Sequence, residues 1–280
     1  MIKNAGIALA LGASFALAGA GQASAADLSA PETMVAEVTP LWDVAFGVAF
    51  MNDYRTRGIS NSDKEFAIQG YAELQALDWF YAGIWASNVQ FADGSTDPAA
   101  EVDLYGGVRH TFGALTLDAG ALFYWYPGET GGETNYWELA FKPSYAITDD
   151  LVVSGTFLYG WDIGNSGGDG FYLVGGAKYT LPYQPITDVS FYVSGEFGKQ
   201  WLGETNIITS VNPREYFNPK DYLTWNAGVG ATYKAMTLDV RYIDTDLSKN
   251  ECGFNTGNRG YCGSTALVKL SFDTALSKLK

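Results

Sequence analysis

The sequence predicts an all-β protein: a transmembrane, antiparallel, up-and-down β-barrel of about twelve strands. Three observations predict it. From Trp42 onward, apolar and polar residues alternate in segments of roughly ten residues, the length with which a tilted strand crosses a bilayer. Short and long connections alternate along the chain. Beyond the N-terminus, no segment offers the roughly 20 apolar residues that a spanning helix needs.

Composition agrees with one large β domain. The chain has 280 residues, of which 15% are aromatic and 33 are glycine, a profile that favours strands and tight turns. Charged residues make up 17%, below the roughly 25% usual for soluble domains. The net charge of −14 repels phosphate backbones, so no nucleic-acid partner is expected.

The N-terminus has the features of a secretory signal peptide. Lys3 precedes an apolar stretch, Ala5–Gly21, and Ala23-Ser24-Ala25 fits the small-x-small pattern of a cleavage site. We therefore predict that residues 1–25 are removed on export. Residues 26–40 would form a short periplasmic segment, residues 41–272 the barrel in the outer membrane, and residues 273–280 a C-terminal tail.

Most predicted strands have one apolar row and one row of small or charged residues; in the strand predicted at 79–91 both rows are largely apolar, and its faces are not assigned. Successive side chains point to opposite faces, so the apolar row would face lipid and the other row the lumen. The first row runs Trp42, Val44, Phe46, Val48, Phe50, Tyr54, and its opposite row continues through Asp53, Arg55 and Arg57. Further strands are predicted at 66–76, 79–91, 101–109, 115–125, 137–142, 151–162, 171–180, 189–197, 223–233, 238–242 and 265–272.

The connections predict the orientation. In outer-membrane barrels short turns face the periplasm and long loops face outside, which would place both chain ends on the periplasmic side. The short connections are 77–78, 112–114, 147–150, 182–187 and 234–235. The long ones are 58–64, 92–100, 127–135, 162–169, 202–220 and 245–263.

Aromatic residues near both strand ends are typical of the two interfacial girdles of such barrels. Those near short turns are Trp42, Tyr145, Tyr179, Tyr233 and Phe272. Those near long loops are Trp125, Trp161, Trp201 and Tyr242.

Two stretches resemble the TorF-type porin family. They read NDYRTRGIS at Asn52–Ser60 and FYAGIWASNVQF at Phe80–Phe91. The matching residues are Tyr54, Arg57, Gly58, Ser60, Tyr81, Gly83, Trp85, Ser87, Asn88 and Val89. The resemblance implies an outer-membrane barrel with a pore. The chain departs from many such barrels at its end, because Phe272 is followed by DTALSKLK.

The charged residues of the inward row are the candidate pore lining. Ionised groups face lipid only at a large energetic cost, so they must meet water or one another. A barrel of eight strands has an interior filled by side chains, and one of sixteen strands encloses an open channel. A barrel of about twelve strands is compatible with either a water-filled bore or a filled, salt-bridged interior. The candidates are Asp53, Arg55, Arg57, Asp103, Arg109, Asp118, Glu138, Lys142, Lys178, Glu196, Asp239 and Arg241.

Catalysis has little support in the sequence, and we predict no enzyme, no cofactor and no metal. A Ser-His-Asp arrangement needs a positioned histidine, and the single one, His110, lies on the apolar row beside Phe112. The two cysteines, Cys252 and Cys262, lie in the last long loop and are expected to form a disulfide in an oxidising compartment.

The leading hypothesis is an outer-membrane porin for small polar or charged solutes. The alternative is a structural or adhesive barrel with a closed lumen, whose loops bind lipopolysaccharide or a surface partner. A third hypothesis is a soluble β domain that binds sugars. Outer-membrane lipid and lipopolysaccharide are the expected surroundings, and a homo-oligomer is left open. The loop Leu202–Lys220 is interpreted either as an inward constriction or as a surface loop.

Overall fold

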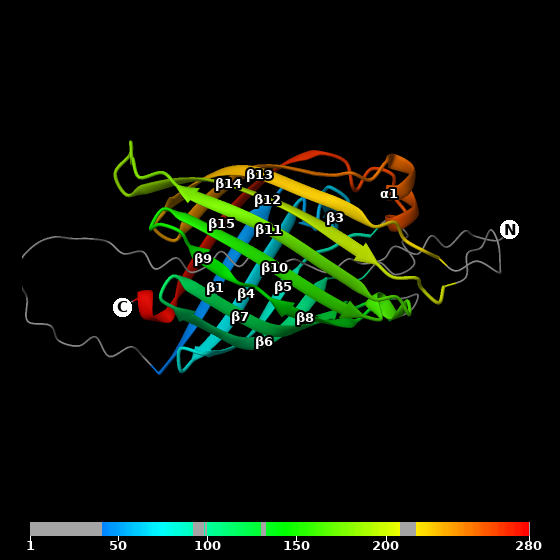
Figure 1. Cartoon of the computed structure of the whole chain (residues 1–280), viewed down its shortest axis with the longest axis horizontal. Coiled ribbons are helices and arrows are strands. Elements are labelled where there is room, and N and C mark those ends of the chain that lie inside the picture. Colours follow the sequence, from blue (N-terminus) through cyan, green and yellow to red (C-terminus); the bar gives the residue numbers. More distant parts are fainter. Residues whose placement is uncertain (1–40, 92–97, 99, 130–132, 208–216, 280) are drawn as a thin grey trace, which may run out of the picture.

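The computed structural model describes residues 41–91, 98, 100–129, 133–207 and 217–279. The expected signal peptide, residues 1–25, and the segment 26–40 lie outside the described residues. One antiparallel sheet closes on itself into a barrel, with a short helix at one end and the C-terminal turn at the other (Figure 1).

Among the described residues, thirteen of the fifteen strands form the wall, and the remaining two form a small hairpin. The wall strands are β1 Trp42–Met51, β4 Ala67–Ala76, β5 Phe80–Ser87, β6 Glu101–Phe112, β7 Leu115–Trp125, β8 Tyr136–Phe141, β9 Ser144–Ala146, β10 Leu151–Trp161, β11 Gly170–Thr180, β12 Val189–Leu202, β13 Tyr222–Tyr233, β14 Met236–Thr245 and β15 Thr265–Ala275. The other elements are β2 Arg55–Thr56, β3 Ile59–Ser60, η1 Ile163–Asn165, α1 Lys249–Thr256 and η2 Leu276–Lys278.

The first and last strands close the barrel. β1 pairs with β4 on one side and with β15 on the other, so that Val48 lies between Gly70 and Phe272. β8 and β9 both pair with β7 and β10, and are two parts of one crossing. Lys142 and Pro143 separate them, because proline has no N–H for the ladder. The barrel therefore has twelve antiparallel crossings, which confirms the predicted fold class.

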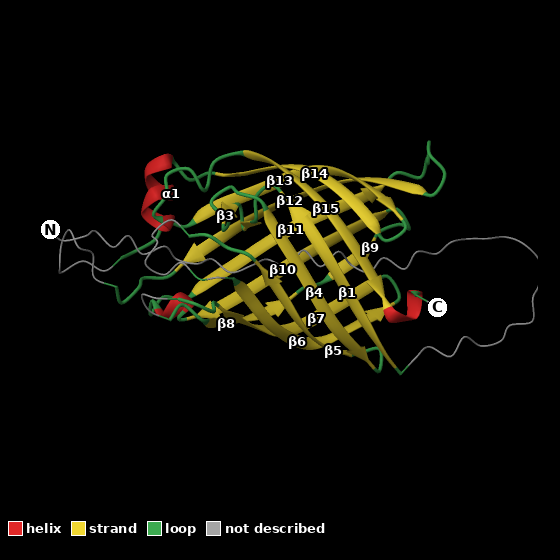
Figure 2. Ribbon diagram, turned by 180° about the vertical axis from the view of Figure 1, so that it is seen from behind, coloured by secondary structure: helices red, strands yellow, loops and turns green. Residues whose placement is uncertain are grey.

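Short and long connections alternate as predicted. The end that carries the turns 77–79, 113–114, 147–150, 181–188 and 234–235 is called here the short-turn end, and the opposite one the long-loop end. Leu77 and Asp78 both have positive φ, 57° and 58°, as the tightest hairpin turns require. Figure 2 shows α1 at the long-loop end and the C-terminus at the short-turn end.

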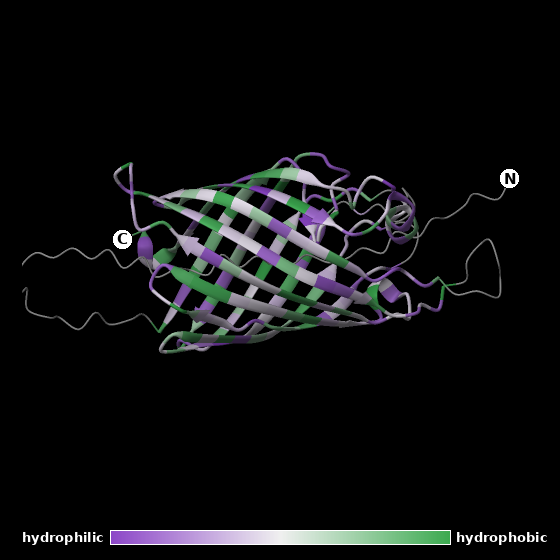
Figure 3. Ribbon diagram, turned by 45° about the horizontal axis from the view of Figure 1, so that its top comes forward, coloured by the Kyte–Doolittle hydropathy of each residue, from purple (hydrophilic) through white to green (hydrophobic). Residues whose placement is uncertain are grey.

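The outer surface of the wall is apolar. Hydrophobic and hydrophilic residues alternate along the strands in Figure 3, and the outward ones include Leu139, 52% exposed, and Val229, 57% exposed. Exposed apolar surface of this extent is what a barrel presents to lipid. Trp42 and Tyr145 are exposed near the short-turn end, and Trp125 and Trp161 near the long-loop end.

No helix among the described residues is long and apolar enough to cross a membrane.

Several strand boundaries differ from the prediction; β5 ends at Ser87 instead of Phe91, and β12 continues to Leu202 instead of ending at Phe197. β15 continues to Ala275, past the expected end at Phe272, and η2 follows it. β1 ends at Met51, whereas the alternating pattern had suggested that the row continued through Tyr54 and Arg57. Tyr54, expected on the outward row, is only 4% exposed and lies inside the barrel, because the chain turns inward after Met51.

The inside–outside assignment can be tested on two adjacent residues of β12. Val193 faces outward and is 42% exposed, whereas Ser194 faces the lumen opposite Gly228. We expect Val193→Arg to lower the free energy of unfolding in lipid by about 2–4 kcal/mol, because its charge meets hydrocarbon. Ser194→Arg should change it by less than about 1 kcal/mol. Equal losses in reversible urea unfolding would contradict the assignment.

Candidate functional site

The lumen nearer the short-turn end is open to water. Ser154, Lys178 and Glu196 belong to inward rows, yet they are exposed. The inward side chains of Arg109 and Arg241 are 27% and 22% exposed. We call this half, lined by these five residues and their inward neighbours, the vestibule. Charged side chains of both signs line it.

One charged cluster of the vestibule centres on Arg109 of β6. Its guanidinium donates from Nε to Asp118 at 2.8 Å and from Nη1 to Glu73 at 3.2 Å. It also lies 4.4 Å from the ring centroid of Tyr81, whose hydroxyl donates to Asp118 at 2.6 Å. The arginine is thus fixed between two carboxylates and an aromatic face.

A second cluster lies on β12, β13 and β14. Arg241 donates from Nε and Nη2 to the two oxygens of Asp239, at 2.6 and 2.8 Å, and from Nη1 to Asn226 at 2.9 Å. Asn226 donates in turn to Glu196 at 2.7 Å. Lys178 lies over the Tyr192 ring, 4.3 Å from its centroid. Both signs of charge therefore alternate around the vestibule.

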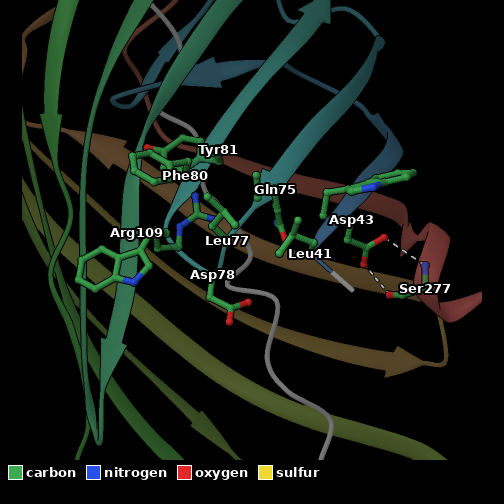
Figure 4. A pocket seen from close by; sticks show the side chains of 12 residues that line it. Leu41, Asp43, Gln75, Leu77, Asp78, Phe80, Tyr81, Arg109 and Ser277 are labelled. Atoms are coloured by element: carbon green, nitrogen blue, oxygen red, sulfur yellow. Dashed lines mark hydrogen bonds between the residues drawn. The ribbon is translucent and has the colours of Figure 1, made fainter. Parts of the chain in front are cut away.

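A pocket of about 360 Å³ opens at the short-turn rim (Figure 4). Arg109 and Tyr81 line it together with Gln75 and the strand-end residues Leu41 and Asp43. Asp43 accepts two hydrogen bonds from Ser277, from the backbone N–H at 3.1 Å and from the hydroxyl at 2.5 Å. These bonds hold η2 at the rim, beside the entrance to the vestibule.

The half of the lumen nearer the long-loop end is filled. Residues 52–66 connect β1 to β4, and the part Asp53–Ser62 folds inward as a hairpin whose strands are β2 and β3; we call this part the inner hairpin. Its Thr56, Ile59 and Ser62 are at most 3% exposed. Around it the inward rows supply a buried aromatic and aliphatic layer that includes Trp85, Tyr105, Leu122, Tyr124, Leu158, Tyr172 and Val174.

Local bonds fix the shape of the inner hairpin. Asp53 accepts from Arg55 Nε and from Ser60 Oγ, both at 2.6 Å. The turn residues Arg57 and Gly58 have φ of 51° and 85°, the left-handed conformation of a two-residue hairpin turn. A Cβ on Gly58 would lie 2.5 Å from Thr245 Cγ2, so the position demands glycine for space as well as for conformation.

Arg57 ties the tip of the inner hairpin to the far wall. Its Nη2 donates to both Glu138 oxygens at 2.7 Å, and its Nη1 donates to Gln200 at 3.0 Å. The guanidinium also lies 5.1 Å from the centroid of Tyr172. Glu138 and Gln200 belong to β8 and β12, far from β1 and β4 around the ring. The Arg57 and Glu138 side chains are 1% and 0% exposed, so each ion needs the other.

The loop between β14 and β15 covers the inner hairpin. It contains α1 and the disulfide Cys252–Cys262, which confirms the predicted pairing. Ser60 N–H donates to the Tyr261 carbonyl at 3.1 Å, and Arg55 Nη1 donates to the Gly263 carbonyl at 2.8 Å. Ile59 packs in one buried cluster with both cysteines and Tyr261.

The predicted pore-lining residues divide into two groups. Nine lie on inward rows of the wall: Asp103, Arg109, Asp118, Glu138, Lys142, Lys178, Glu196, Asp239 and Arg241. Asp53, Arg55 and Arg57 do not lie on the wall, because β1 has already ended, and belong to the inner hairpin instead. Sequence reasoning missed Glu73, Glu101, Gln200 and Lys269, although the alternation could have found them.

Two further expectations concern single segments. His110 stacks on Trp79, with ring centroids 3.9 Å apart, in a structural position near a short turn. Of the loop Leu202–Lys220, residues 208–216 lie outside the described part. Phe217 packs in the buried layer of the lumen, and its ring lies 4.8 Å from that of Phe254 in α1.

Comparisons with known proteins identify the family of the chain. A family model described as "Bacterial protein of unknown function (Gcw_chp)" matches residues 35–272. No curated protein sequence is similar to the chain. The barrel that the resemblance to TorF-type porins implied is present, whereas the TorF assignment itself stays a prediction.

Among solved structures, the chain is similar to a KdgM porin in complex with disordered oligogalacturonate, with a TM-score of 0.49 and 10% identity over 82% of this chain and 98% of that one. It is also similar to the NanC porin, with a TM-score of 0.46 and 12% identity over 83% and 98%. For LpxR from Salmonella typhimurium, the TM-score is 0.41 and the identity 7%, over 82% of this chain and 99% of that one. These similarities concern barrels in general.

Replacing Arg57 by alanine should strongly destabilise the barrel. The change leaves Glu138 buried without its cation, which costs about 3–5 kcal/mol. Unfolding by urea in detergent micelles measures the loss. The double variant Arg57→Ala/Glu138→Gln should recover much of it, since no charge is then left alone. A single-variant loss below about 1 kcal/mol would mean that the pair behaves like a surface ion pair.

Removing the disulfide should loosen the inner hairpin. Cys252→Ser/Cys262→Ser removes the cross-link that restricts the unfolded chain, which should lower the free energy of unfolding by about 2–3 kcal/mol for a loop of this size. Amide exchange of Ser60, bonded to the Tyr261 carbonyl, should become faster, while exchange in β10 should stay the same. Unchanged exchange at Ser60 would show that the covering loop does not hold the hairpin.

Proposed function

We propose that this chain, which belongs to the Gcw_chp family, is an outer-membrane porin through which small polar or charged solutes pass. The observation that carries the proposal is the vestibule. Ionised side chains of both signs line it, and several are exposed to water within the barrel. A closed barrel with a purely structural role has no need of a hydrated, charged interior.

The outer surface supports the membrane part of this proposal. In hydrocarbon every backbone N–H and C=O must be bonded within the protein, which a sheet closed by β1 and β15 achieves. The outward rows are apolar along the strands, and an even number of crossings places the start of β1 and the end of β15 at the same end of the barrel. By analogy with barrels of this kind, we assign the short-turn end to the periplasm and the long loops to the cell exterior.

Passage requires the inner hairpin to move. The hairpin fills the outer half of the lumen, but it is not part of the wall ladder. It is bound there by the side chains of Arg57, on Glu138 and Gln200, and of Arg55, on the Gly263 carbonyl. Two backbone bonds add to these, from Ser60 N–H to the Tyr261 carbonyl and from Gln90 N–H to the Asn61 carbonyl. The wall strands would keep their pairing if the hairpin withdrew. The inner hairpin is therefore proposed as the gate of the pore, with the Arg57–Glu138 pair as its latch.

The vestibule would select solutes by size and by charge pattern. Arg109 and Arg241 each carry a carboxylate beside them, whereas Lys178 rests on an aromatic ring and remains exposed. A polar solute would exchange its hydration for these groups one after another. A mixed lining of this kind favours solutes that carry hydroxyl and charged groups together.

A second candidate function follows from the filled outer half. If the inner hairpin never leaves, the barrel is a scaffold, and its long loops are the functional surface. α1 and the disulfide-bonded loop would then present a rigid surface to lipopolysaccharide or to a partner. The buried Arg57–Glu138 pair favours this alternative, because breaking it is costly.

Single-channel conductance in planar bilayers separates the two functions. We expect wild-type openings to be rare, and Arg57→Ala/Glu138→Gln to raise the open fraction roughly tenfold or more, because the latch is gone without a stranded charge. Lys234→Ala, on an exposed short turn, is the matched control and should behave as wild type.

Glu196→Gln should shift the reversal potential of the open state in a salt gradient toward anions. If neither the wild type nor the double variant conducts while both are inserted and folded, the porin function is refuted and the scaffold function takes its place.

A further inference from the structure

Several glycines on the inward rows of the wall lie beneath a tyrosine of a neighbouring strand. The two residues are direct register partners in each case: Gly47 with Tyr71, Gly83 with Tyr105, Gly107 with Tyr81 and Gly230 with Tyr192. A Cβ on Gly230 would lie 2.2 Å from Tyr192 Cζ and 2.4 Å from its hydroxyl oxygen. The tyrosine therefore occupies the space that a side chain on the glycine would need.

Two of these tyrosines reach past the glycine to a carboxylate on the next strand. Tyr192 of β12 passes over Gly230 of β13, and its hydroxyl donates to Asp239 of β14 at 2.7 Å. In the same way Tyr81 of β5 passes over β6 and donates to Asp118 of β7 at 2.6 Å. Neighbouring strands are about 4.8 Å apart, so a side chain that reaches the second strand lies along the wall and does not point toward the barrel axis.

A cation lies over each of these two rings. The guanidinium of Arg109 is 4.4 Å from the ring centroid of Tyr81, and Lys178 Nζ is 4.3 Å from that of Tyr192. A hydrogen bond from a hydroxyl to a carboxylate is about twice as strong as one between neutral groups, and a cation over the ring adds to it. Both tyrosines are therefore fixed parts of the lining.

The two fixed tyrosines lie on opposite sides of the barrel. Tyr81 is near the start of β5 and Tyr192 near the start of β12, and both strands start at the short-turn end. Five crossings lie between these strands on each side of the ring: β6, β7, β8 with β9, β10 and β11 on one side, and β13, β14, β15, β1 and β4 on the other. The space left between the two tyrosines therefore limits what enters the vestibule from this end.

We propose that Tyr81 and Tyr192 set the free width of the vestibule, and with it the size limit of the solutes that enter. Glycine in the wall is what lets Tyr192 lie along it, because a Cβ on Gly230 would turn the ring toward the opposite side. The size limit rests on the proposed porin function. The width itself is a property of the barrel and can be measured without passage.

The test is chemical modification of a single thiol in the vestibule of the full chain, refolded in detergent micelles. Ser154→Cys supplies the thiol, since the two native cysteines are joined to each other and Ser154 is exposed. Its register partner Gly176 pairs with Glu196, which lies deeper along β12 than Tyr192. N-ethylmaleimide is the small probe, and a maleimide that carries a poly(ethylene glycol) chain is the large one.

The measured quantity is the rate of the large probe divided by that of the small one. We expect Gly230→Ala to lower this ratio roughly fivefold or more, because the displaced Tyr192 ring enters the bore. Gly175→Ala is the matched control and should leave the ratio unchanged. It adds the same methyl group to an exposed outward position, where the nearest atom is 3.9 Å away.

Variants of Tyr192 show whether the glycine acts through this ring. Tyr192→Ala should raise the ratio, and Gly230→Ala should then have no further effect. Should Gly230→Ala fold poorly, Tyr192→Phe keeps the ring but loses the bond to Asp239, and we expect it to lower the ratio about twofold.

An unchanged ratio in folded Gly230→Ala and in Tyr192→Phe would overturn the proposal. A decrease caused by Gly230→Ala that persists in the Tyr192→Ala background would overturn it as well, because the glycine would then act by another route. The expected ratios in a barrel that never conducts would support the assigned width and refute solute passage alone.

Discussion

The backbone pairing of β1 with β15 is the constraint on which the rest of the structure depends. Without it, the sheet would have two edges with unpaired N–H and C=O groups, which hydrocarbon does not tolerate. Once the barrel is closed, successive side chains of each strand face lipid and lumen in turn. The clusters around Arg109 and Arg241, and the buried Glu138, owe their positions to this closure.

The inner hairpin divides the lumen into two different environments. Towards the short turns, Lys178 and Glu196 are exposed and Arg109 and Arg241 are partly exposed, whereas the carboxylates that pair with these arginines are buried. Towards the long loops, Arg57 and Glu138 are removed from water, so each of the two charges has to be compensated by the other. One barrel thus contains a hydrated channel segment and a dry core, and the boundary lies where the hairpin meets the wall.

The sequence was sufficient to predict the strands of the wall, because alternation, turn residues and loop lengths are local signals. It predicted the twelve crossings, the inward positions from Asp103 to Arg241 and the Cys252–Cys262 bond. It failed after Met51, where the alternation persists through Arg57 although the strand has ended. The inward position of the hairpin depends on contacts with Glu138 and Tyr261, which lie far along the chain. A single sequence contains no signal that predicts contacts between such distant residues. The sequence indicated a turn there only through the charged residues Asp53, Arg55 and Arg57 followed by Gly58.

The attachment of the inner hairpin to the loop before β15 has a consequence for the order of assembly. The hairpin is made from the first strands to be synthesised, but Tyr261 and Gly263, which fasten it, arrive with the last. A chain inserted only in part would carry the hairpin unfastened, and Ile59 would be uncovered. Fastening therefore coincides with completion of the barrel. A partly assembled barrel would have a lumen that the hairpin does not block, and the lumen would become blocked only when the last strand is in place.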